Sequence, residues 1–435
     1  MDRRRVLGLG AAALTAALVP ARGRAAADPG AVLADWYRLV LQLVRHTATY
    51  SPPVAARAFG YLGVAGYEAV AACDPAMTSL ADQLNGLMPL PTPEPGAHDA
   101  AAVLHAALAL SVAQFFANTG PSGQRAMAAM TRKLEQQVTA GLPDDVAERS
   151  AALGMAIAGH VIAWAAEDGG AVIENMGFPF SYTPRSAPDA WVPTSLIRQQ
   201  QAPLLPDWGK NRPFAMPMAN TCALPPPPAY SEVPGSAFHA EAMEVYTVTR
   251  ALTDEQMLIA RFWSDDPMLS PTPPGHWISL TVDLIARDQM PLPAAVDVLA
   301  RLGIAMADGF IGCWYSKVEY DLLRPVTYIN RVIDKGWRPA LITPPFPEYP
   351  SGHSTQSGAA ATVLTAVFGD DFAFDDATHV REGLPVRRFA SFWQAAEEAG
   401  ISRLYGGIHF RSAIEQGLEQ GRCIGAHAVA LRTLS

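Results

Sequence analysis

The apolar residues of the chain are grouped in alanine-, leucine- and valine-rich stretches that end at proline or glycine. A capping pattern at Thr253 and Gln256 indicates the start of one helix, and helical spacing continues over 276–289 and 294–323. No long alternation of apolar and polar residues indicates a strand. The pattern therefore predicts an all-α protein. Further helices are expected over 31–49, 54–73, 100–118, 123–140 and 144–166.

Prolines are dense between residues 181 and 236, where Pro225 to Pro228 form a run of four. We predict that this stretch is an irregular connection that wraps the helical core. It would separate an N-terminal helical part, residues 28–180, from a C-terminal helical part, residues 237–435. A chain of this length exceeds what one simple hydrophobic core organises, so two packed helical bundles or closely joined subdomains are expected.

Residues 1–27 have the pattern of a twin-arginine export signal. Arg3 to Arg5 precede an apolar stretch from Val6 to Val19, and the alanines at 25–27 offer a cleavage site. This stretch of 14 residues is short for a membrane span, and no later run reaches about 18 uninterrupted apolar residues. The sequence therefore predicts a periplasmic or extracellular protein that is soluble and has no membrane span.

Cleavage after Ala27 would remove five basic residues and one acidic residue, leaving 27 basic against 40 acidic residues and a formal charge of −13. Nucleic acid is therefore not expected as a partner. The four cysteines are widely scattered and show no C-x-x-C spacing, which argues against a zinc cluster. Export would permit disulfides, but the sequence assigns neither their pairing nor the oligomeric state.

Three short segments in the last third of the chain carry the residue types that bind an oxyanion. Lysine, arginine, serine and a backbone N–H can donate hydrogen bonds to the oxygens of the anion. Two histidines could act on opposite sides of it, one bonding its central atom and one moving a proton. We therefore predict one positively lined pocket. The residues are Lys317, Arg324, Ser351, Gly352, His353, Arg403 and His409.

The spacing of these residues suggests how they converge. Lys317 and Arg324 are seven apart, so we expect them to share one face of a helix that ends near Pro325. The pair Gly406-Gly407 lets the chain bend before His409. The Ser-Gly-His segment precedes an apolar run that reaches Val367, so it should open a helix whose N-terminus favours an anion.

At these positions the chain resembles the vanadium-dependent haloperoxidases, and their secreted bacterial branch in particular. That family shares its fold and its oxyanion pocket with acid phosphatases and type-2 phosphatidic acid phosphatases. The resemblance implies helical bundles of this type with long proline-rich loops, and orthovanadate as the cofactor. His409 would bond vanadate and His353 would be the acid–base residue. The vanadate oxygens would be held by Lys317, Arg324, Ser351, Gly352 and Arg403.

Aromatic residues extend the resemblance beyond the pocket. Trp314 and Phe346 fall where fungal chloroperoxidases place aromatic residues beside the halide. Trp263 lies in another haloperoxidase-like segment, which also supplies a carboxylate that would support a pocket arginine. Either Asp265 or Asp266 could take that role.

The chain departs from the phosphatase pattern at Ala413, where an aspartate would orient the second histidine. Another group must therefore fix His409. The sequence leaves Glu415, the two aspartates of the Trp263 segment and a backbone carbonyl as candidates. His276 and His379 have no ligand-like partners in a shared motif, so we interpret them as structural or surface groups.

Three functional hypotheses follow. The first is oxidation of bromide or chloride by hydrogen peroxide to hypohalous acid or an equivalent halogenating species, with a small organic molecule as an acceptor. The second is phosphoester hydrolysis, in which His409 attacks phosphorus and His353 protonates the leaving oxygen. The third is binding of phosphate or vanadate without catalysis. The sequence does not distinguish chloride from bromide.

Overall fold

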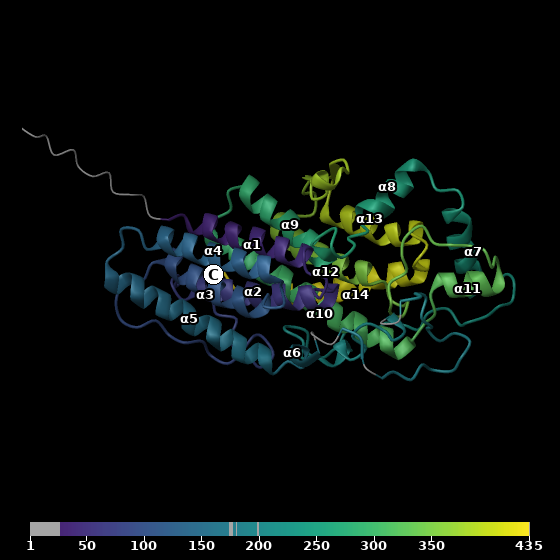
Figure 1. The fold of residues 1–435 in the computed structure, drawn as a ribbon, viewed down its shortest axis with the longest axis horizontal. Helices are drawn as coiled ribbons and strands as arrows, with labels where there is room; N and C mark the ends of the chain where they lie inside the picture. Colours follow the sequence, from purple (N-terminus) through teal and green to yellow (C-terminus); the bar gives the residue numbers. More distant parts are fainter. Residues whose placement is uncertain (1–26, 174–176, 180, 198–199, 435) are drawn as a thin grey trace, which may run out of the picture.

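The computed structural model describes residues 27–434 except 174–176, 180 and 198–199. The predicted export signal lies outside the described residues, apart from Ala27. Helices dominate the described chain, and the all-α prediction is confirmed. The N-terminal helices, purple to blue in Figure 1, are α1 (Pro29–Arg45), α2 (Pro52–Ala71), α3 (Ala100–Phe115), α4 (Pro121–Val138), α5 (Asp144–Ala166) and α6 (Gly170–Ile173).

The C-terminal part begins after a long irregular stretch that contains the short 3-10 helix η2 (Trp208–Lys210). Strands β1 (Phe374–Asp376) and β2 (Arg387–Phe389) pair antiparallel, with the 3-10 helix η3 (Val380–Glu382) between them. The helices are α7 (Ala237–Thr249), α8 (Asp254–Phe262), α9 (Thr272–Arg287), α10 (Leu292–Tyr320), α11 (Pro325–Val332), α12 (Gly352–Phe368), α13 (Phe392–Tyr405) and α14 (Arg411–Val429).

Several of the predicted helices begin at a residue whose side chain accepts from a free N–H group of the first turn. The Thr253 hydroxyl accepts from the N–H of Gln256, and the Gln256 side chain accepts from the N–H of Thr253, so the capping box predicted for α8 is confirmed. The side chains of Asp28 and Asp99 each accept from one backbone N–H at the start of α1 and α3. These caps fix where the N-terminal helices start.

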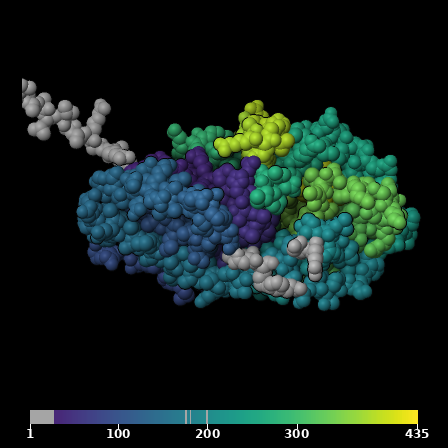
Figure 2. Space-filling model, in the orientation of Figure 1, coloured from purple at the N-terminus to yellow at the C-terminus, as the bar shows by residue number. Residues whose placement is uncertain are grey.

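The two parts of the chain share one hydrophobic core, because α10 packs closely against α2. Glycines allow this approach. A Cβ on Gly63 of α2 would lie 2.9 Å from the Cα of Ala300, and one on Gly303 of α10 would lie 2.7 Å from the Phe59 carbonyl oxygen. Figure 2 shows the result as a single elongated body in which the purple and blue helices continue into the teal, green and yellow ones.

Helix α12 lies against α10, α13 and α14, so its N-terminus is held at the centre of the C-terminal part. Small residues again bring the backbones together, since a Cβ on Gly421 of α14 would lie 2.2 Å from the Thr355 carbonyl oxygen. This packing fixes the position of the Ser-Gly-His segment.

None of the described helices combines the length and the apolar character needed to cross a lipid bilayer.

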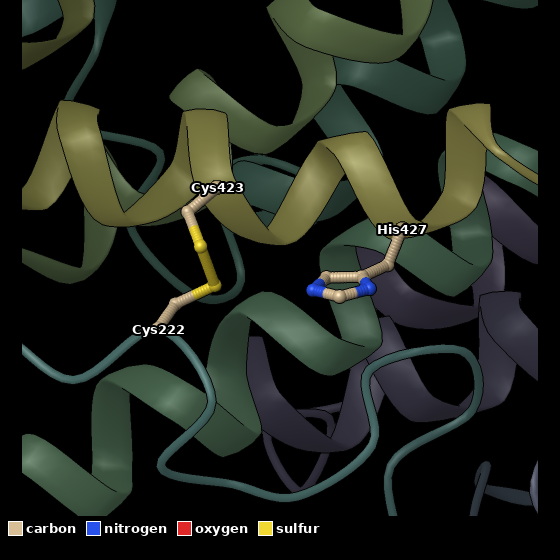
Figure 3. Close-up of side chains that lie close together, drawn as sticks. All are labelled: Cys222, Cys423 and His427. Atoms are coloured by element: carbon tan, nitrogen blue, oxygen red, sulfur yellow. A yellow bond between two sulfur atoms is a disulfide. The ribbon is translucent and has the colours of Figure 1, made fainter.

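The proline-rich stretch is tied to the helical core at several points. Cys222 forms a disulfide with Cys423 of α14, with an S–S distance of 2.02 Å (Figure 3). Cys73 and Cys313 are free thiols. The Trp191 N–H donates to the carbonyl of Asp321, the residue that follows α10, at 2.8 Å. The stretch therefore holds the end of α10 in place.

Candidate active site

His409 lies in the turn between α13 and α14. Gly407 in this turn has φ of 75°, a left-handed conformation that glycine adopts without strain, so the predicted bend is confirmed. His409 Nδ1 is 2.8 Å from Glu348 Oε1, and His409 Nε2 is 3.0 Å from Arg324 Nη1. Since the Arg324 guanidinium can only donate, Nε2 accepts from it and Nδ1 carries the proton of the neutral ring. The Nε2 lone pair therefore faces the cations of the pocket.

Glu348 is the group that orients His409. Its Oε1 also accepts from the Phe410 N–H at 2.9 Å, and burial raises its pKa to about 8. None of the three carboxylates considered from the sequence binds His409 in the described structure. Glu348 lies 61 residues away in sequence, which explains why local spacing missed it. The available signal was a carboxylate inside the proline-rich segment that precedes Ser351.

Arg324 reaches the pocket from a different element than predicted. Helix α10 ends at Tyr320, and Asp321 takes a left-handed conformation with φ of 43°. Arg324 is the extended residue that precedes Pro325 at the start of α11. The prediction that Lys317 and Arg324 share one helix face is therefore wrong.

Both cations nevertheless lie beside one aromatic ring. The centroid of Phe346 is 5.1 Å from Lys317 Nζ and 5.0 Å from Arg324 Cζ. Arg324 donates from Nε to the Phe346 carbonyl at 2.9 Å and from Nη1 to the Ile408 carbonyl at 2.8 Å. Its Nη2 is buried and has no hydrogen-bond partner among the described residues. Burial lowers the pKa of Arg324 to about 10, which leaves the group charged near neutral pH.

Lys317 is fully enclosed and donates to three backbone carbonyls. They belong to Pro347 at 2.8 Å, Glu348 at 3.0 Å and Pro350 at 2.5 Å. Burial, together with the charge of Arg324, lowers the pKa of Lys317 to about 7. Lys317 therefore fastens the loop before Ser351, and its ammonium would act on an anion through charge or by exchanging one of these bonds.

The N-terminus of α12 supplies the second predicted segment. Ser351 is the N-cap, and its hydroxyl accepts from the Ser354 N–H at 3.3 Å. Gly352 and His353 follow as the first helical residues, and both line the cavity that His409 also lines, which has a volume of about 550 Å³. The two predicted catalytic rings thus face one cavity.

The ring of His353 is buried, and its Nε2 has no hydrogen-bond partner among the described residues. Burial holds the pKa of His353 well below its usual range, and Arg403 lowers it further. The pKa of His409 is lowered by burial first and by Arg324 next. Both imidazoles are therefore neutral near neutral pH, as a ligand and a general base require.

Arg403, in the last turn of α13, lines the same cavity. Its guanidinium donates to the Ser402 hydroxyl at 2.9 Å and to the Trp263 carbonyl at 2.5 Å. Asp265 and Asp266 also line the cavity, but no ion pair of 4.0 Å or less joins either of them to Arg403 in the described chain. Both carboxylates act on Arg403 only through their charge.

The predicted aromatic walls are present in part. Trp314 and Phe346 line the cavity, with ring centroids 5.0 Å apart, and Phe310, which we had not predicted, lines it beside Trp314. Trp263 does not line it. Its ring stacks on His276 with centroids 4.6 Å apart, and its indole N–H donates to Glu398, so the placement of Trp263 in a halide pocket is wrong.

Comparison with known proteins agrees with this geometry. A protein-family model described as the second helical-bundle domain of VCPO matches residues 297–433. The vanadium chloroperoxidase of Curvularia inaequalis is 27% identical over 168 residues, a match that spans 26% of this chain and 27% of that enzyme. A bacterial vanadium-dependent iodoperoxidase of known structure is 38% identical, with a TM-score of 0.86 over 93% of this chain and 97% of its own. The chain belongs to the vanadium-dependent haloperoxidases.

A more distant bacterial vanadium-dependent chloroperoxidase, in its holo form, shares the fold at 16% identity, with a TM-score of 0.64 over 88% of this chain and 94% of its own.

The pocket of the present chain fits vanadate. The unpartnered Arg324 Nη2 and His353 Nε2 are buried polar atoms that an oxyanion and its ligands would satisfy. The His409 Nε2 lone pair accepts from Arg324 Nη1 at 3.0 Å and would bond the vanadium in place of that contact, while Arg324 and Arg403 supply positive charge.

Proposed function

We propose that this protein oxidises halide ions with hydrogen peroxide to hypohalous acid or an equivalent halogenating species, with vanadate held at His409. The observation that carries the proposal is the arrangement of the two imidazoles. His409 has its Nδ1 proton fixed by Glu348 at 2.8 Å, and His353 faces the same cavity with a free Nε2. One imidazole is thus prepared to bond a metal and the other to move a proton.

Vanadate, when bound, would supply a Lewis acid that activates peroxide without changing its own oxidation state. Around it, Arg324 Nη2 would donate to an oxygen and Arg403 would offset negative charge. Lys317 would add its ammonium charge beside the loop that it fastens. Because these groups are already held by backbone carbonyls and buried rings, they would need little reorganisation during the reaction.

His353 would accept the proton of peroxide at Nε2. Its lowered pKa keeps the ring neutral, and the same ring could return the proton to the departing oxygen species. Trp314 and Phe346 would form the apolar wall beside the halide and limit its hydration. The named relatives are one iodoperoxidase and two chloroperoxidases, so iodide, bromide and chloride are all candidate substrates.

Phosphoester hydrolysis at the same pocket is not favoured. Glu348, rather than an aspartate at position 413, orients His409, and the aromatic walls match a halide pocket. Binding without catalysis would leave the free His353 Nε2 without a role.

The test uses purified apoprotein incubated with orthovanadate, hydrogen peroxide and each halide in turn. We expect oxidised halide to form only when vanadate is present. A parallel reaction with a phosphomonoester and no vanadate should give no hydrolysis. Vanadate-independent ester hydrolysis without halide oxidation would contradict the proposal.

We further propose that the chain is exported by the twin-arginine route to the periplasm or the medium. The support is the pattern of residues 1–27 and the disulfide between Cys222 and Cys423, a bond that persists in oxidising compartments. Replacement of Arg3 and Arg4 by lysine should leave the precursor in the cytoplasm, as fractionation with immunodetection would report. Unchanged export would refute the proposed route.

A further inference from the structure

A second group of potential metal ligands lies outside the oxyanion pocket, beside the wall of its cavity. It consists of Asp265 from the loop between α8 and α9, His276 from α9, Asp376 at the end of β1, and His379 just before η3. All four side chains are buried, with exposures between 0% and 5%. The proposed halide chemistry assigns no role to either histidine.

Three of these residues converge on one point. His276 Nδ1 lies 3.2 and 3.1 Å from the two Asp265 carboxylate oxygens, and His379 Nε2 lies 3.1 Å from Asp265 Oδ1. Their ligand atoms all lie within 4.8 Å of one another. A zinc ion about 2.0 to 2.2 Å from each ligand atom of a tetrahedral site keeps those atoms roughly 3.3 Å apart. The observed spacing therefore accommodates one ion with small adjustments.

The outer contacts match those of metal-bound histidines. His276 Nε2, the nitrogen that points away from Asp265, is 2.7 Å from Asp376 Oδ2, and Asp376 Oδ1 accepts from the Thr378 N–H at 2.9 Å. Glu382 Oε2 lies 3.8 Å from His379 Nδ1. A carboxylate on the far nitrogen fixes the ring and raises its basicity as a ligand. His276 thus has a carboxylate at hydrogen-bonding distance from its far nitrogen, whereas the carboxylate nearest the far nitrogen of His379 lies just beyond that distance.

Charge and backbone geometry agree with an ion at this point. Asp265 and Asp376 place two carboxylates in the interior and raise the pKa of His276 to about 10, so a positive charge is favoured at this point, and a divalent cation would supply it in place of the His276 proton. Asp265, Met268 and Thr272 all take left-handed conformations, with φ of 47°, 69° and 65°. Such strain in non-glycine residues persists where surrounding contacts fix the loop, and it gathers at functional sites.

We propose that Asp265, His276 and His379 bind one divalent transition-metal ion, with Asp376 positioning His276. Two imidazoles and one carboxylate favour zinc or a similar ion over calcium or magnesium, which take oxygen ligands. Asp265 is one of the residues that line the cavity, so the proposed site lies beside a route from solvent. This proposal is independent of the halide chemistry. A purely hydrogen-bonded histidine–aspartate network is the alternative that the test must separate.

The other ligand group in the described chain, Cys222 with Cys423 and His427, is not a competing site. Figure 3 shows that the two sulfurs are joined in a disulfide beside the His427 ring, so neither is a thiolate. His427 therefore provides a matched control. His427→Gln removes a partly buried imidazole without touching the proposed ligands.

The experiment uses the full mature chain, purified without metal-affinity resin and exchanged against zinc or cobalt(II). Metal content is measured by inductively coupled plasma mass spectrometry, with vanadium counted separately. Bound cobalt(II) is followed by its visible ligand-field absorption. We expect one ion per chain in the wild type and in His427→Gln, and at least a tenfold lower content in His379→Gln. A wild type that retains neither metal, or a His379→Gln variant that retains a full equivalent, would overturn the proposal.

A second variant covers failure of His379→Gln to fold. Asp376→Asn keeps both ring ligands and changes only the outer contact of His276, so its zinc dissociation constant should rise about 10- to 100-fold. Circular dichroism and size-exclusion chromatography check that the variant is folded. Zinc affinity equal to that of the wild type would contradict the assignment.

Discussion

Replacement of Glu348 by glutamine tests how the site prepares His409 for its ligand. Glutamine has nearly the same shape, but it lacks the charge that strengthens the bond from His409 Nδ1, and it can also present an NH₂ group in place of the acceptor. Hydrogen bonds to charged groups contribute about 1.5 to 3 kcal/mol. Loss of such an outer partner of a metal ligand weakens metal affinity about 10- to 100-fold. We expect the vanadate dissociation constant of Glu348→Gln to rise within that range.

The assay is a titration of apoprotein with orthovanadate, followed by recovered halide oxidation and by equilibrium binding. Glu415→Gln is the matched control, because Glu415 is close to His409 in sequence but is exposed and pairs with Arg411 at 3.7 Å. This control should bind vanadate like the wild type. A Glu348→Gln variant with wild-type affinity and turnover would refute the view that this carboxylate orients His409.

The pH profile gives a second readout of the same variant. Burial raises the pKa of Glu348 to about 8, and protonation removes the negative charge that strengthens its hydrogen bond from the Nδ1–H of His409, so affinity should fall as the pH decreases below that value. Burial lowers the pKa of Lys317 to about 7, so affinity should also fall as the pH rises and the ammonium is lost. Wild-type affinity should be greatest near pH 7 to 8. Glu348→Gln should lose the decline on the acid side only.

Three further predictions concern separate parts of the molecule. His353→Ala should lower the turnover number for halide oxidation about 100-fold or more and change the vanadate dissociation constant little. Turnover and binding are measured in parallel, and an equal loss of both would contradict a proton-transfer role. Trp314→Ala should raise the KM for halide more than it lowers kcat, measured by steady-state kinetics, because it removes an apolar wall of the cavity. Cys222→Ser should lower the free energy of unfolding by about 2 to 4 kcal/mol in denaturant titrations, since the disulfide closes a separation of 201 residues, whereas Cys73→Ser, which alters a free thiol, should change it little.

Local sequence predicted the elements whose boundaries are set by local chemistry. The capping box of Thr253 and Gln256 starts α8 as expected, and the glycines before His409 form the predicted bend. The end of α10 at Tyr320 was not predicted, because the contacts that hold the next residue come from residues distant in sequence. Asp321 is held by the N–H of Trp191 at 2.8 Å and by Arg185 at 3.3 Å, both from the proline-rich stretch. No signal near Asp321 records these contacts.

In the candidate site, too, some features were predictable from the sequence and others depend on residues that are distant in sequence. Residue types and spacing predicted that His353, His409 and Arg403 line one pocket, because binding and acting on a single oxyanion would need all three side chains; all three line the same cavity. The partners of the histidines were not predictable, since they depend on side chains that are remote in sequence. Asp265 meets His379 across 114 residues, and Trp263 turns away from the cavity to stack on His276. From the sequence, His276 and His379 were interpreted as structural or surface groups. The structure shows that both are buried, so neither is a surface group.

The location of the orienting carboxylate has a physical reason in the packing of α14. At position 413, where the phosphatase pattern carries an aspartate, the backbone carbonyl accepts from the Ser351 N–H at 2.9 Å, and the Ala413 side chain is fully buried. A carboxylate there would have to enter the contact between α14 and the start of α12. The carboxylate of Glu348 instead reaches His409 from the loop that Lys317 fastens through three carbonyls. The lysine that supplies positive charge thus also positions the residue that fixes the imidazole, so a change at either residue should alter the orientation of His409.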